Sequence, residues 1–315
     1  MEPNRILIID RVHSVLALEF QHYGFQCLYD PEYFDKGDLS DFEEFYGIVV
    51  RSKKIGKEIL LNPNNLKFIG RVGSGLENID VDYAESLGIK CFNSPEGSRD
   101  SVGEHCMSIL LSLLNKVCKS DQELKKNIWD RNNNWGTELK GKTIGIIGYG
   151  NMGSAFAEKL SGFGVNVIAY DKYKKGFSDA FVTESSMERI YAETDILSFH
   201  VPLTEETEYL LNTDYLSSFT KDIYVINSSR GKVVRTADLV QAMKEGKVKG
   251  AALDVLEYEK SAFEKLDFNT LPEDLKYLLD ANNAIITPHV AGWTDESYFK
   301  LSKVLFDKVR KEFNL

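Results

Sequence analysis

A glycine-rich turn near the middle of the chain limits the possible folds more than any other feature. The apolar run Thr143–Ile147 predicts a buried strand, and the sequence GYGNMG (148–153) follows it directly. A helical pattern then runs through Leu160, and a second predicted strand, Val165–Tyr170, ends at Asp171. This order of strand, glycine-rich turn, helix, strand and acidic residue is typical of a dinucleotide-binding βαβ unit.

Each part of this unit has a physical use in holding a dinucleotide. Gly148 permits the tight turn, Gly150 lets the backbone approach a pyrophosphate, and Gly153 lets the helix pack closely on the strand. The amide dipoles at the start of the helix attract the phosphates. Asp171 would accept hydrogen bonds from the adenosine ribose and repel a 2′-phosphate, which predicts NAD rather than NADP despite the adjacent Lys172. The ordinary alternative is a glycine-rich turn and a surface aspartate that bind no ligand.

Chemically distinctive residues also follow the later predicted strands of this segment. Those strands are Asp195–Phe199, Ile223–Asn227, Gly250–Leu253 and Ala284–Thr287. The residues that follow them include His200, Val201, Pro202, Ser228, Ser229, Arg230, Asp254 and His289. Because ligands bind beyond the carboxyl ends of parallel strands, we expect these residues to line one cleft.

Two of these residues suggest a reaction. Arg230 presents a rigid fork of donors that suits a carboxylate, and His289 can exchange a proton near neutral pH. A carboxylate beside the histidine would orient its ring, and the residues alone leave Asp254, Glu257 and Glu259 as candidates. A lone arginine in a turn is usually a surface charge, and a lone histidine is usually structural. Together with a bound dinucleotide, however, they predict oxidation of a 2-hydroxy acid with hydride transfer to NAD.

The first segment of the chain also alternates short apolar runs with amphipathic ones. Its predicted strands are Arg5–Asp10, Phe25–Tyr29, Gly47–Arg51, Phe68–Val72 and Ile89–Phe92. Strands that alternate with helices predict a mainly parallel sheet, and 315 residues suit two domains better than one. We therefore predict an α/β protein with two doubly wound parallel-sheet domains.

A long helix with an apolar stripe is predicted from Ser101, with Glu104 at capping-box spacing.

Composition excludes several other classes. The 38 Lys+Arg and 48 Asp+Glu give a net charge of −10, which argues against nucleic-acid or anionic-membrane binding. The apolar stretch Ser108–Leu114 is too short to span a membrane, and the first residues lead into a predicted strand without the apolar core that a signal peptide would show. The four cysteines show no spacing typical of disulfides or zinc ligands, so we expect a cytoplasmic protein without a metal site.

The motifs together resemble those of the D-isomer-specific 2-hydroxyacid dehydrogenases, over almost the whole chain. The matching stretches are GRVGSGLENID (70–80), NSPEGSRDSVGEH (93–105), GTELKGKTIGIIGYGNMG (136–153), FHVPLT (199–204), NSSRG (227–231), ALDVLEYE (252–259) and TPHVAG (287–292). The resemblance implies a Rossmann NAD domain (97–290) inserted into a flavodoxin-like substrate domain (1–96 and 291–315). It also implies a cleft that closes on the substrate, and a homodimer formed through the helix from Ser101.

The resemblance assigns roles by position within the motifs. The catalytic arginine, glutamate and histidine fall on Arg230, Glu259 and His289, and Asp254 takes the role of holding the nicotinamide amide. The positions expected to contact NAD are Ser74, Gly148, Gly150, Asn151, Met152, Gly153, Asp171, His200, Val201, Pro202, Ser228, Ser229, Asp254 and Gly292. Arg230 and the amides of Ser74 and Gly75 would bind the substrate carboxylate, and His289 would move the hydroxyl proton.

Within the family, the motifs are most similar to those of the D-3-phosphoglycerate dehydrogenases, which begin serine synthesis. In those enzymes the arginine matching Arg51 helps to hold the substrate phosphate. In this chain Arg51 and Lys53, two residues apart, would hold it. Arg131 resembles a basic residue contributed by the neighbouring subunit. The ordinary alternative is a solvated basic turn. Only 26 residues follow His289, so we expect no serine-sensing domain.

Some departures and alternatives remain open. Lys260 stands where the family usually has proline, and the stretch 261–282 is longer than expected, so the loop that carries Glu259 could differ. A dehydrogenase acting on glyoxylate, hydroxypyruvate or a D-lactate-like acid is the main alternative. Formate dehydrogenase is disfavoured because its histidine partners a glutamine. An NAD-sensing corepressor-type binding protein is a third hypothesis, and absence of turnover would favour it.

Overall fold

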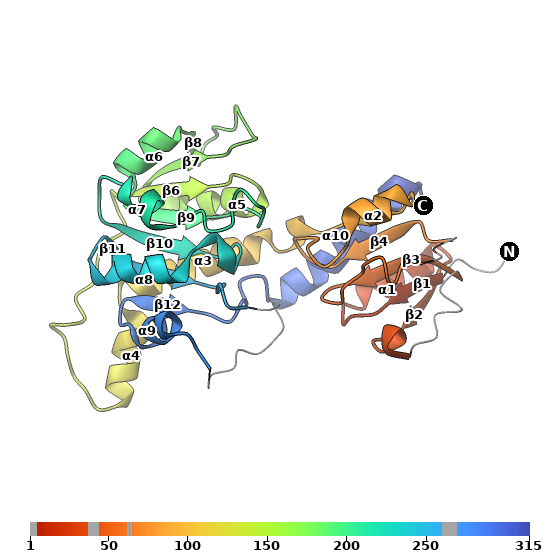
Figure 1. The fold of residues 1–315 in the computed structure, drawn as a ribbon, viewed down its shortest axis with the longest axis horizontal. Helices are drawn as coiled ribbons and strands as arrows, with labels where there is room; N and C mark the ends of the chain where they lie inside the picture. The colour runs from red at the N-terminus through yellow and green to blue at the C-terminus, as the bar shows by residue number, and fades with distance from the viewer. Residues whose placement is uncertain (1–4, 37–43, 62, 64, 260–269) are drawn as a thin grey trace. The chain divides into compact units, whose positions relative to one another are not determined.

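The computed structural model describes residues 5–36, 44–61, 63, 65–259 and 270–315. Lys260 and the first part of the long stretch 261–282 therefore lie outside the described residues. The chain forms two compact units, one of Met1–Arg99 with Trp293–Leu315 and one of Asp100–Gly292 (Figure 1). No helix within the described ranges has both the length and the apolar character needed to cross a bilayer.

The first unit contains a parallel five-stranded sheet in the order β2-β1-β3-β4-β5. Its strands are β1 (Arg5–Ile8), β2 (Gln26–Tyr29), β3 (Phe45–Val50), β4 (Phe68–Arg71) and β5 (Lys90–Phe92). Its helices are α1 (Val15–His22), α2 (Val81–Ser86) and α10 (Asp295–Phe313), with short 3₁₀ turns η1 (Tyr33–Lys36) and η3 (Pro95–Gly97). The C-terminal segment thus completes the domain that the N-terminal segment begins.

Both faces of this sheet are covered. On one face Phe20 of α1 and Phe306 of α10 pack together, with ring centroids 5.1 Å apart. On the other face Ala84 of α2 packs into a separate apolar core. Burial on both sides explains why β3 reads as an almost continuous apolar run. Helix α10 begins with a capping box formed by Thr294 and Ser297.

The second unit contains a parallel seven-stranded sheet in the order β12-β11-β10-β9-β6-β7-β8. Its strands are β6 (Thr143–Ile147), β7 (Asn166–Tyr170), β8 (Thr183–Glu184), β9 (Ile196–Phe199), β10 (Ile223–Asn227), β11 (Val248–Leu253) and β12 (Ala284–Ile286). Its helices are α3 (Arg99–Leu114), α4 (Val117–Lys125), α5 (Asn151–Leu160), α6 (Met187–Glu193), α7 (Thr213–Ser217), α8 (Thr236–Lys244) and α9 (Glu273–Asp280), with η4 (Ser161–Phe163) and η5 (Gly231–Val233).

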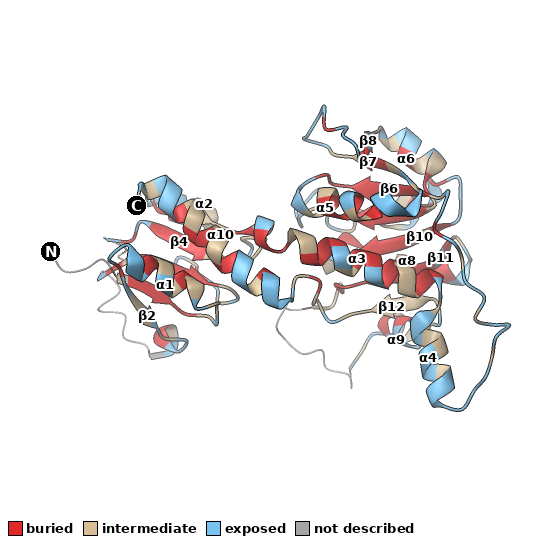
Figure 2. Cartoon of the chain, turned by 180° about the vertical axis from the view of Figure 1, so that it is seen from behind, coloured by how far each residue is buried: buried red, intermediate tan, exposed pale blue. Residues whose placement is uncertain are grey.

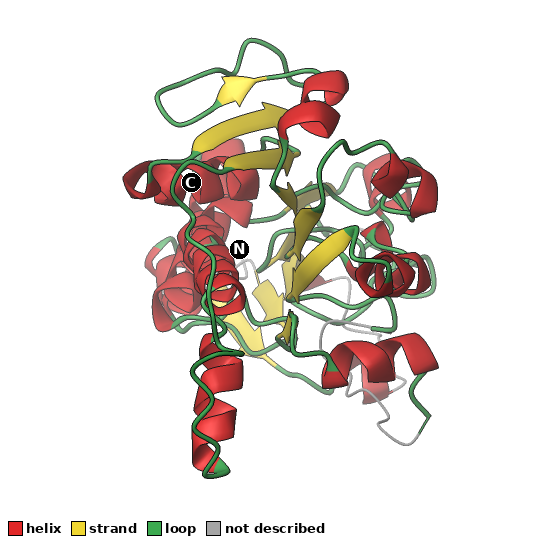
Figure 3. Cartoon of the chain, turned by 90° about the vertical axis from the view of Figure 1, so that its left-hand side faces the viewer, coloured by secondary structure: helices red, strands yellow, loops and turns green. Residues whose placement is uncertain are grey.

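Helices cover both faces of this sheet as well. Helices α3 and α5 contribute Leu110 and Phe156 to the core on one face. Helices α6, α8 and α9 contribute Ile190, Leu239 and Leu275 to the core on the other. Figure 2 shows that the central strands, such as β6 and β10, are buried whereas the edge strand β12 is only partly buried, and Figure 3 shows the strands flanked by helices. The predicted fold class, two parallel-sheet α/β domains with the NAD-type domain inserted in the other, is confirmed.

Candidate active site

Three neighbouring turns form the candidate site at the carboxyl ends of β10, β11 and β12. Backbone hydrogen bonds connect each turn to the neighbouring strand or turn. The Asp254 N–H donates to the Asn227 carbonyl at 2.9 Å, and the Thr287 N–H donates to the Leu253 carbonyl at 3.0 Å. The His289 N–H then donates to the Asp254 carbonyl at 2.8 Å. The turns that carry Arg230, Asp254 and His289 therefore lie side by side, although they are far apart in sequence.

His289 and Glu259 form the central pair of the site. The Nδ1 atom of His289 lies 2.8 Å from Oε2 of Glu259, and their side chains are 29% and 18% exposed. The second oxygen of Glu259 accepts the Leu256 N–H at 2.5 Å, which fixes the carboxylate in the loop. Because Nδ1 bonds to Glu259, a proton exchanged with a substrate would pass through Nε2.

The backbone of His289 has a conformation that is unusual for a residue with a side chain. Its φ of 55° lies in the left-handed region. Such conformations persist only where the surroundings hold them, and they concentrate at functional sites. The turn around His289 is therefore held by its neighbours rather than by its own preference.

The three candidate acids have different partners. Glu259 contacts His289, whereas the Glu257 carboxylate accepts the Thr236 N–H at the start of α8 at 2.8 Å. Asp254 is 1% exposed, and its carboxylate faces the backbone of the His289 turn. Spacing alone could not separate these acids, and the contacts select Glu259 as the partner of the histidine.

Asp254 holds the turn that carries His289. Its Oδ1 accepts the Thr287 hydroxyl at 2.6 Å and the Val290 N–H at 2.9 Å, and its Oδ2 accepts the Ala291 N–H at 2.9 Å. Burial raises the pKa of Asp254, but the hydrogen bonds from His105, Thr287 and the two backbone N–H groups outweigh it, so the pKa lies below its usual value. The carboxylate is therefore ionised inside the fold.

Arg230 lies in a turn stabilised by Asn227. The Asn227 side chain donates to the Arg230 carbonyl at 2.9 Å, and its Oδ1 accepts the Ser229 N–H at 3.0 Å and hydroxyl at 2.7 Å. The next residue, Gly231, touches the backbone of Leu256, so that a Cβ atom there would overlap the Leu256 carbonyl. This glycine lets the Arg230 turn approach the loop that leads to Glu259. Sequence reasoning did not single out Asn227, although an asparagine before a glycine-containing turn often forms such bonds.

The glycine-rich turn after β6 fits a dinucleotide. Gly148 has a φ of 90°, and a Cβ atom there would lie 2.6 Å from the His200 carbonyl oxygen. A Cβ atom at Gly153 would overlap the Gly148 carbonyl, so helix and turn are in close contact. At Gly150, by contrast, no heavy atom lies within 4 Å of the Cβ position, and α5 starts without a side-chain cap. Open space beside uncapped helix N–H groups is what a pyrophosphate needs.

Asp171, at the end of β7, is held by backbone donors. Its carboxylate accepts the N–H groups of Tyr149, Tyr173 and Lys174, each at 2.9 Å. Burial raises the pKa of Asp171, but these bonds and the nearby Lys174 outweigh it and lower the pKa. The adjacent Lys172 pairs with Glu206 at 2.7 Å, so its charge is already balanced. An ionised Asp171 suits ribose hydroxyls and disfavours a 2′-phosphate.

Like Ser229 and Asp254, two further residues expected to contact NAD have side chains that bond within the protein. The His200 ring bonds to Ser198 at 2.8 Å and lies 5.6 Å from the Phe156 ring of α5, and burial lowers its pKa to about 4. The hydroxyl of Ser228 lies 3.1 Å from the thiol of Cys106 in α3. The parts of these residues left for a cofactor are therefore chiefly backbone.

In the first unit, Arg51 and Lys53 lie on a turn that binds an internal carboxylate. Asp10 accepts the N–H groups of Arg51 at 2.6 Å, Ser52 at 2.8 Å and Lys53 at 3.1 Å. The Arg51 guanidinium lies over the Trp293 ring, 4.5 Å from its centre, and burial lowers the Arg51 pKa. The Lys53 ammonium pairs with Asp35 at 3.0 Å. The turn is therefore less basic than its sequence suggests.

The loop with Ser74 and Gly75 is braced by Arg71 and Asn93. Arg71 donates to the Gly75 carbonyl at 2.9 Å and to the Arg51 carbonyl at 3.1 Å, which connects the two segments predicted to bind substrate. The Asn93 side chain donates to the Ser74 carbonyl at 2.7 Å. Sequence reasoning gave no role to Arg71 or Asn93, because their bonds depend on the sheet bringing separate loops together.

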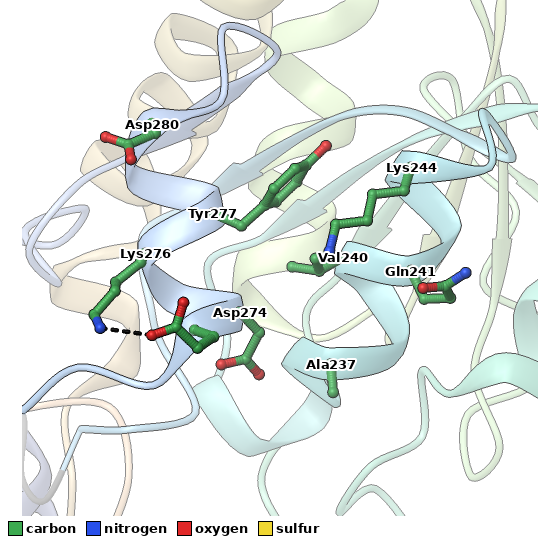
Figure 4. Close-up of a pocket in the computed structure, with 9 residues that line it drawn as sticks. Ala237, Val240, Gln241, Lys244, Asp274, Lys276, Tyr277 and Asp280 are labelled. Atoms are coloured by element: carbon green, nitrogen blue, oxygen red, sulfur yellow. Dashed lines mark hydrogen bonds and ion pairs between the residues drawn. The ribbon is translucent and has the colours of Figure 1, made fainter.

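A groove lies between α8 and α9. Figure 4 shows its residues, among them Lys244 and Tyr277, whose ammonium and ring centre are 4.9 Å apart. Lys276 pairs with Glu273 at 2.7 Å. None of the predicted site residues lines this groove.

Comparison with protein families and known proteins identifies the chain at the family level. Residues 107–291 match the NAD binding domain of the D-isomer specific 2-hydroxyacid dehydrogenases, and residues 6–195 match the catalytic domain of that family. The chain therefore belongs to the D-isomer specific 2-hydroxyacid dehydrogenase family. The predicted family and the predicted cofactor, NAD, are both confirmed.

Individual relatives have different substrates. The chain is 34% identical to the hydroxypyruvate reductase of Thermotoga maritima over 286 residues, which cover 90% of each protein. It is 33% identical to the D-3-phosphoglycerate dehydrogenase of Archaeoglobus fulgidus over 274 residues, 86% of this chain and 50% of that protein. The chain thus spans about half the length of that relative. The crystal structure of D-lactate dehydrogenase from Aquifex aeolicus with NAD and lactic acid has a TM-score of 0.81 and 27% identity, covering 99% of this chain and 96% of that one.

Proposed function

We propose that this chain interconverts a D-2-hydroxy acid and its 2-keto acid with NAD, using Arg230, His289 and Glu259. The observation that carries the proposal is the 2.8 Å contact between His289 and Glu259, because the turn with Asp254 connects the His289 turn to the turn that holds Arg230. An imidazole paired with a carboxylate is suited to general acid–base catalysis. An arginine nearby is suited to holding a carboxylate.

In the oxidative direction, Arg230 binds the substrate carboxylate and orients C2. His289 accepts the hydroxyl proton at Nε2, and Glu259 stabilises the imidazolium that forms. The nicotinamide ring, when NAD is bound, supplies the acceptor for the hydride that leaves C2. In the reductive direction, the His289 imidazolium donates the proton to the keto oxygen. The glycine-rich turn and Asp171 would hold the pyrophosphate and the ribose.

For the substrate, we propose 3-phospho-D-glycerate, oxidised to 3-phosphohydroxypyruvate. Two observations support it: the resemblance to D-3-phosphoglycerate dehydrogenases, and Arg51 and Lys53 on one turn. A second candidate is hydroxypyruvate without the phosphate. It is favoured by the relative from Thermotoga maritima, which matches over 90% of both chains, and by the acids Asp10 and Asp35 that bind the Arg51 turn.

A substrate panel tests both the activity and the choice between these candidates. Oxidation of NADH is followed with hydroxypyruvate, phosphohydroxypyruvate, glyoxylate and pyruvate. We expect turnover of the keto acids, with the highest kcat/KM for phosphohydroxypyruvate. A higher kcat/KM for hydroxypyruvate would select the second candidate, and no turnover of any keto acid would refute the proposed function.

The Arg51→Ala variant tests the phosphate contact directly. We expect it to raise the KM for the phosphorylated substrate by about tenfold or more, because a charge-assisted hydrogen bond contributes about 1.5–3 kcal/mol. The KM for hydroxypyruvate should change much less. Lys54→Ala, on the same turn, removes an exposed positive charge and is the matched control. Equal effects of Arg51→Ala on the two substrates would count against a phosphate contact.

We also propose that the chain assembles as a homodimer. The support lies in α4 and the segment after it, which expose large apolar side chains: Leu124 is 56%, Trp129 79% and Trp135 81% exposed. Analytical ultracentrifugation tests this proposal. A sedimentation coefficient of a monomer at micromolar concentration would contradict it.

A further inference from the structure

Helix α3 contacts the rear of the turn that carries His289. From this helix, the Nε2 atom of His105 lies 3.0 Å from the Thr287 hydroxyl and 3.4 Å from Oδ1 of Asp254. The next residue, Cys106, contacts Ser228 of the Arg230 turn at 3.1 Å. Two adjacent residues of one helix thus contact the turn that carries His289 and the turn that carries Arg230.

The hydrogen bonds of this cluster can be assigned from its chemistry. A threonine hydroxyl has one hydrogen, and Thr287 donates it to Asp254 at 2.6 Å. The Thr287 oxygen must then act as acceptor toward His105, so Nε2 of His105 carries the proton. The donors therefore all point toward the Asp254 carboxylate: the His105 N–H faces the Thr287 oxygen at 3.0 Å and Oδ1 of Asp254 at 3.4 Å, and the Thr287 hydroxyl donates to the same Oδ1.

Asp254 in turn accepts hydrogen bonds from residues before and after His289. Its carboxylate accepts the N–H groups of Val290 and Ala291, and its carbonyl accepts the N–H of His289. These bonds surround the one residue of the turn with a left-handed backbone, at φ 55°. Because such a backbone must be held by its surroundings, the Asp254 carboxylate helps to hold the turn from which the His289 ring reaches Glu259.

We propose that His105 is a positioning residue, which keeps the His289 ring in place through Thr287 and Asp254. The proposal rests on the role proposed for His289 in proton transfer. His105 itself would not touch the substrate. Its contribution is to orient a buried carboxylate, as outer-shell hydrogen bonds do in other sites.

Replacing His105 should therefore slow the chemical step and leave cofactor binding almost unchanged. We expect His105→Ala to lower kcat for keto-acid reduction by about 100-fold, because small displacements of a catalytic group have effects of that size. The dissociation constant of NADH should stay within about twofold of the wild type. The primary isotope effect with deuterated NADH should rise, because hydride transfer and its coupled proton transfer become rate-limiting.

Conservative variants separate positioning from general destabilisation. His105→Gln keeps a side-chain N–H that can reach Thr287, and Thr287→Ser keeps the hydroxyl, so both should retain most of the wild-type kcat. Thr287→Val should behave like His105→Ala, and the double variant should be little worse than either single one, because both break the same chain of bonds. Ser108→Ala, an exposed residue of the same helix, is the control that should resemble the wild type.

An NMR measurement tests the proposal without turnover. The His289 ring signals, assigned by comparison with a His289→Asn variant, should shift in His105→Ala and Thr287→Val and remain in place in Ser108→Ala. Unchanged ring signals, or an active wild type with an unchanged kcat and isotope effect in His105→Ala, would overturn the proposal. The proposal would also be overturned if kcat of His105→Ala fell only because a smaller fraction of the variant is folded. Failure of the proposed function would show separately, as a wild type that reduces no keto acid.

Discussion

Replacing Glu259 by glutamine tests the acid–base pair at the centre of the site. The change keeps the size of the side chain and removes its negative charge. The carboxylate lies 2.8 Å from Nδ1 of His289, which places the two charge centres about 4 Å apart. At that separation an imidazolium–carboxylate pair gains about 4 kcal/mol at an effective dielectric constant of about 20, and about 1 kcal/mol in bulk water.

The partial exposure of the pair places the effect between these limits. The side chains are 29% and 18% exposed, so water screens part of the interaction. Each 1.4 kcal/mol corresponds to about tenfold in rate, so kcat for keto-acid reduction should fall by about 10- to 1,000-fold in Glu259→Gln.

Steady-state reduction of the preferred keto acid at saturating substrate measures this loss of kcat. Glu257→Gln is the matched control, because it removes a negative charge from the same loop but from a carboxylate that accepts the Thr236 N–H instead. A Glu259→Gln variant with a kcat within about twofold of the wild type would refute the assignment of Glu259 as the partner of His289.

Further predictions concern the cofactor, the packing of the turns and a buried histidine. Asp171→Asn should raise the KM for NAD by about tenfold, because a charged hydrogen bond contributes about 1.5–3 kcal/mol. It should also reduce the preference for NAD over NADP, measured as the ratio of the two kcat/KM values. An unchanged ratio would exclude Asp171 from cofactor choice. Gly231→Ala should lower the free energy of unfolding, measured in urea titrations, by about 1–3 kcal/mol, because the new Cβ would overlap the Leu256 carbonyl. Gly162→Ala is the control, because its Cβ would meet no heavy atom within 4 Å. Burial lowers the pKa of His200 from 6.5 to about 4, so the unfolded chain binds more protons, and stability should fall by about 2 kcal/mol from about pH 7 to about pH 5. His200→Asn should remove that loss, and an equal loss in the variant would contradict it.

The strands could be predicted from the sequence because most of them are buried on both faces. Apolar runs located β6 and β10 at their observed bounds, Thr143–Ile147 and Ile223–Asn227. Strand β8 was missed, because Thr183–Glu184 has two residues and no apolar pattern. The spacing of Ser101 and Glu104 predicted a helix start, but α3 begins at Arg99 and Ser101 is buried within the helix.

The residue types of the site were predictable, but their partners were not. Strand ends identified Arg230, Asp254 and His289, because polar residues after buried strands collect at one edge of a parallel sheet. The partner of His289 depends on how a loop folds, so the sequence left several acids open before the family resemblance favoured Glu259. The bonds of Asp10 to the Arg51 turn join separate strands of the sheet, and no local pattern could indicate them.

The transfer of deuterium from NADH labelled at the reactive position of nicotinamide tests the central claim most directly. The product of keto-acid reduction is isolated, and the configuration and label at C2 are determined by chiral chromatography and mass spectrometry. Direct hydride transfer with proton donation by His289 predicts a D-2-hydroxy acid that carries one deuterium at C2, formed by the wild type and almost absent with His289→Ala. An L product, a product without label at C2, or equal turnover by His289→Ala would contradict it.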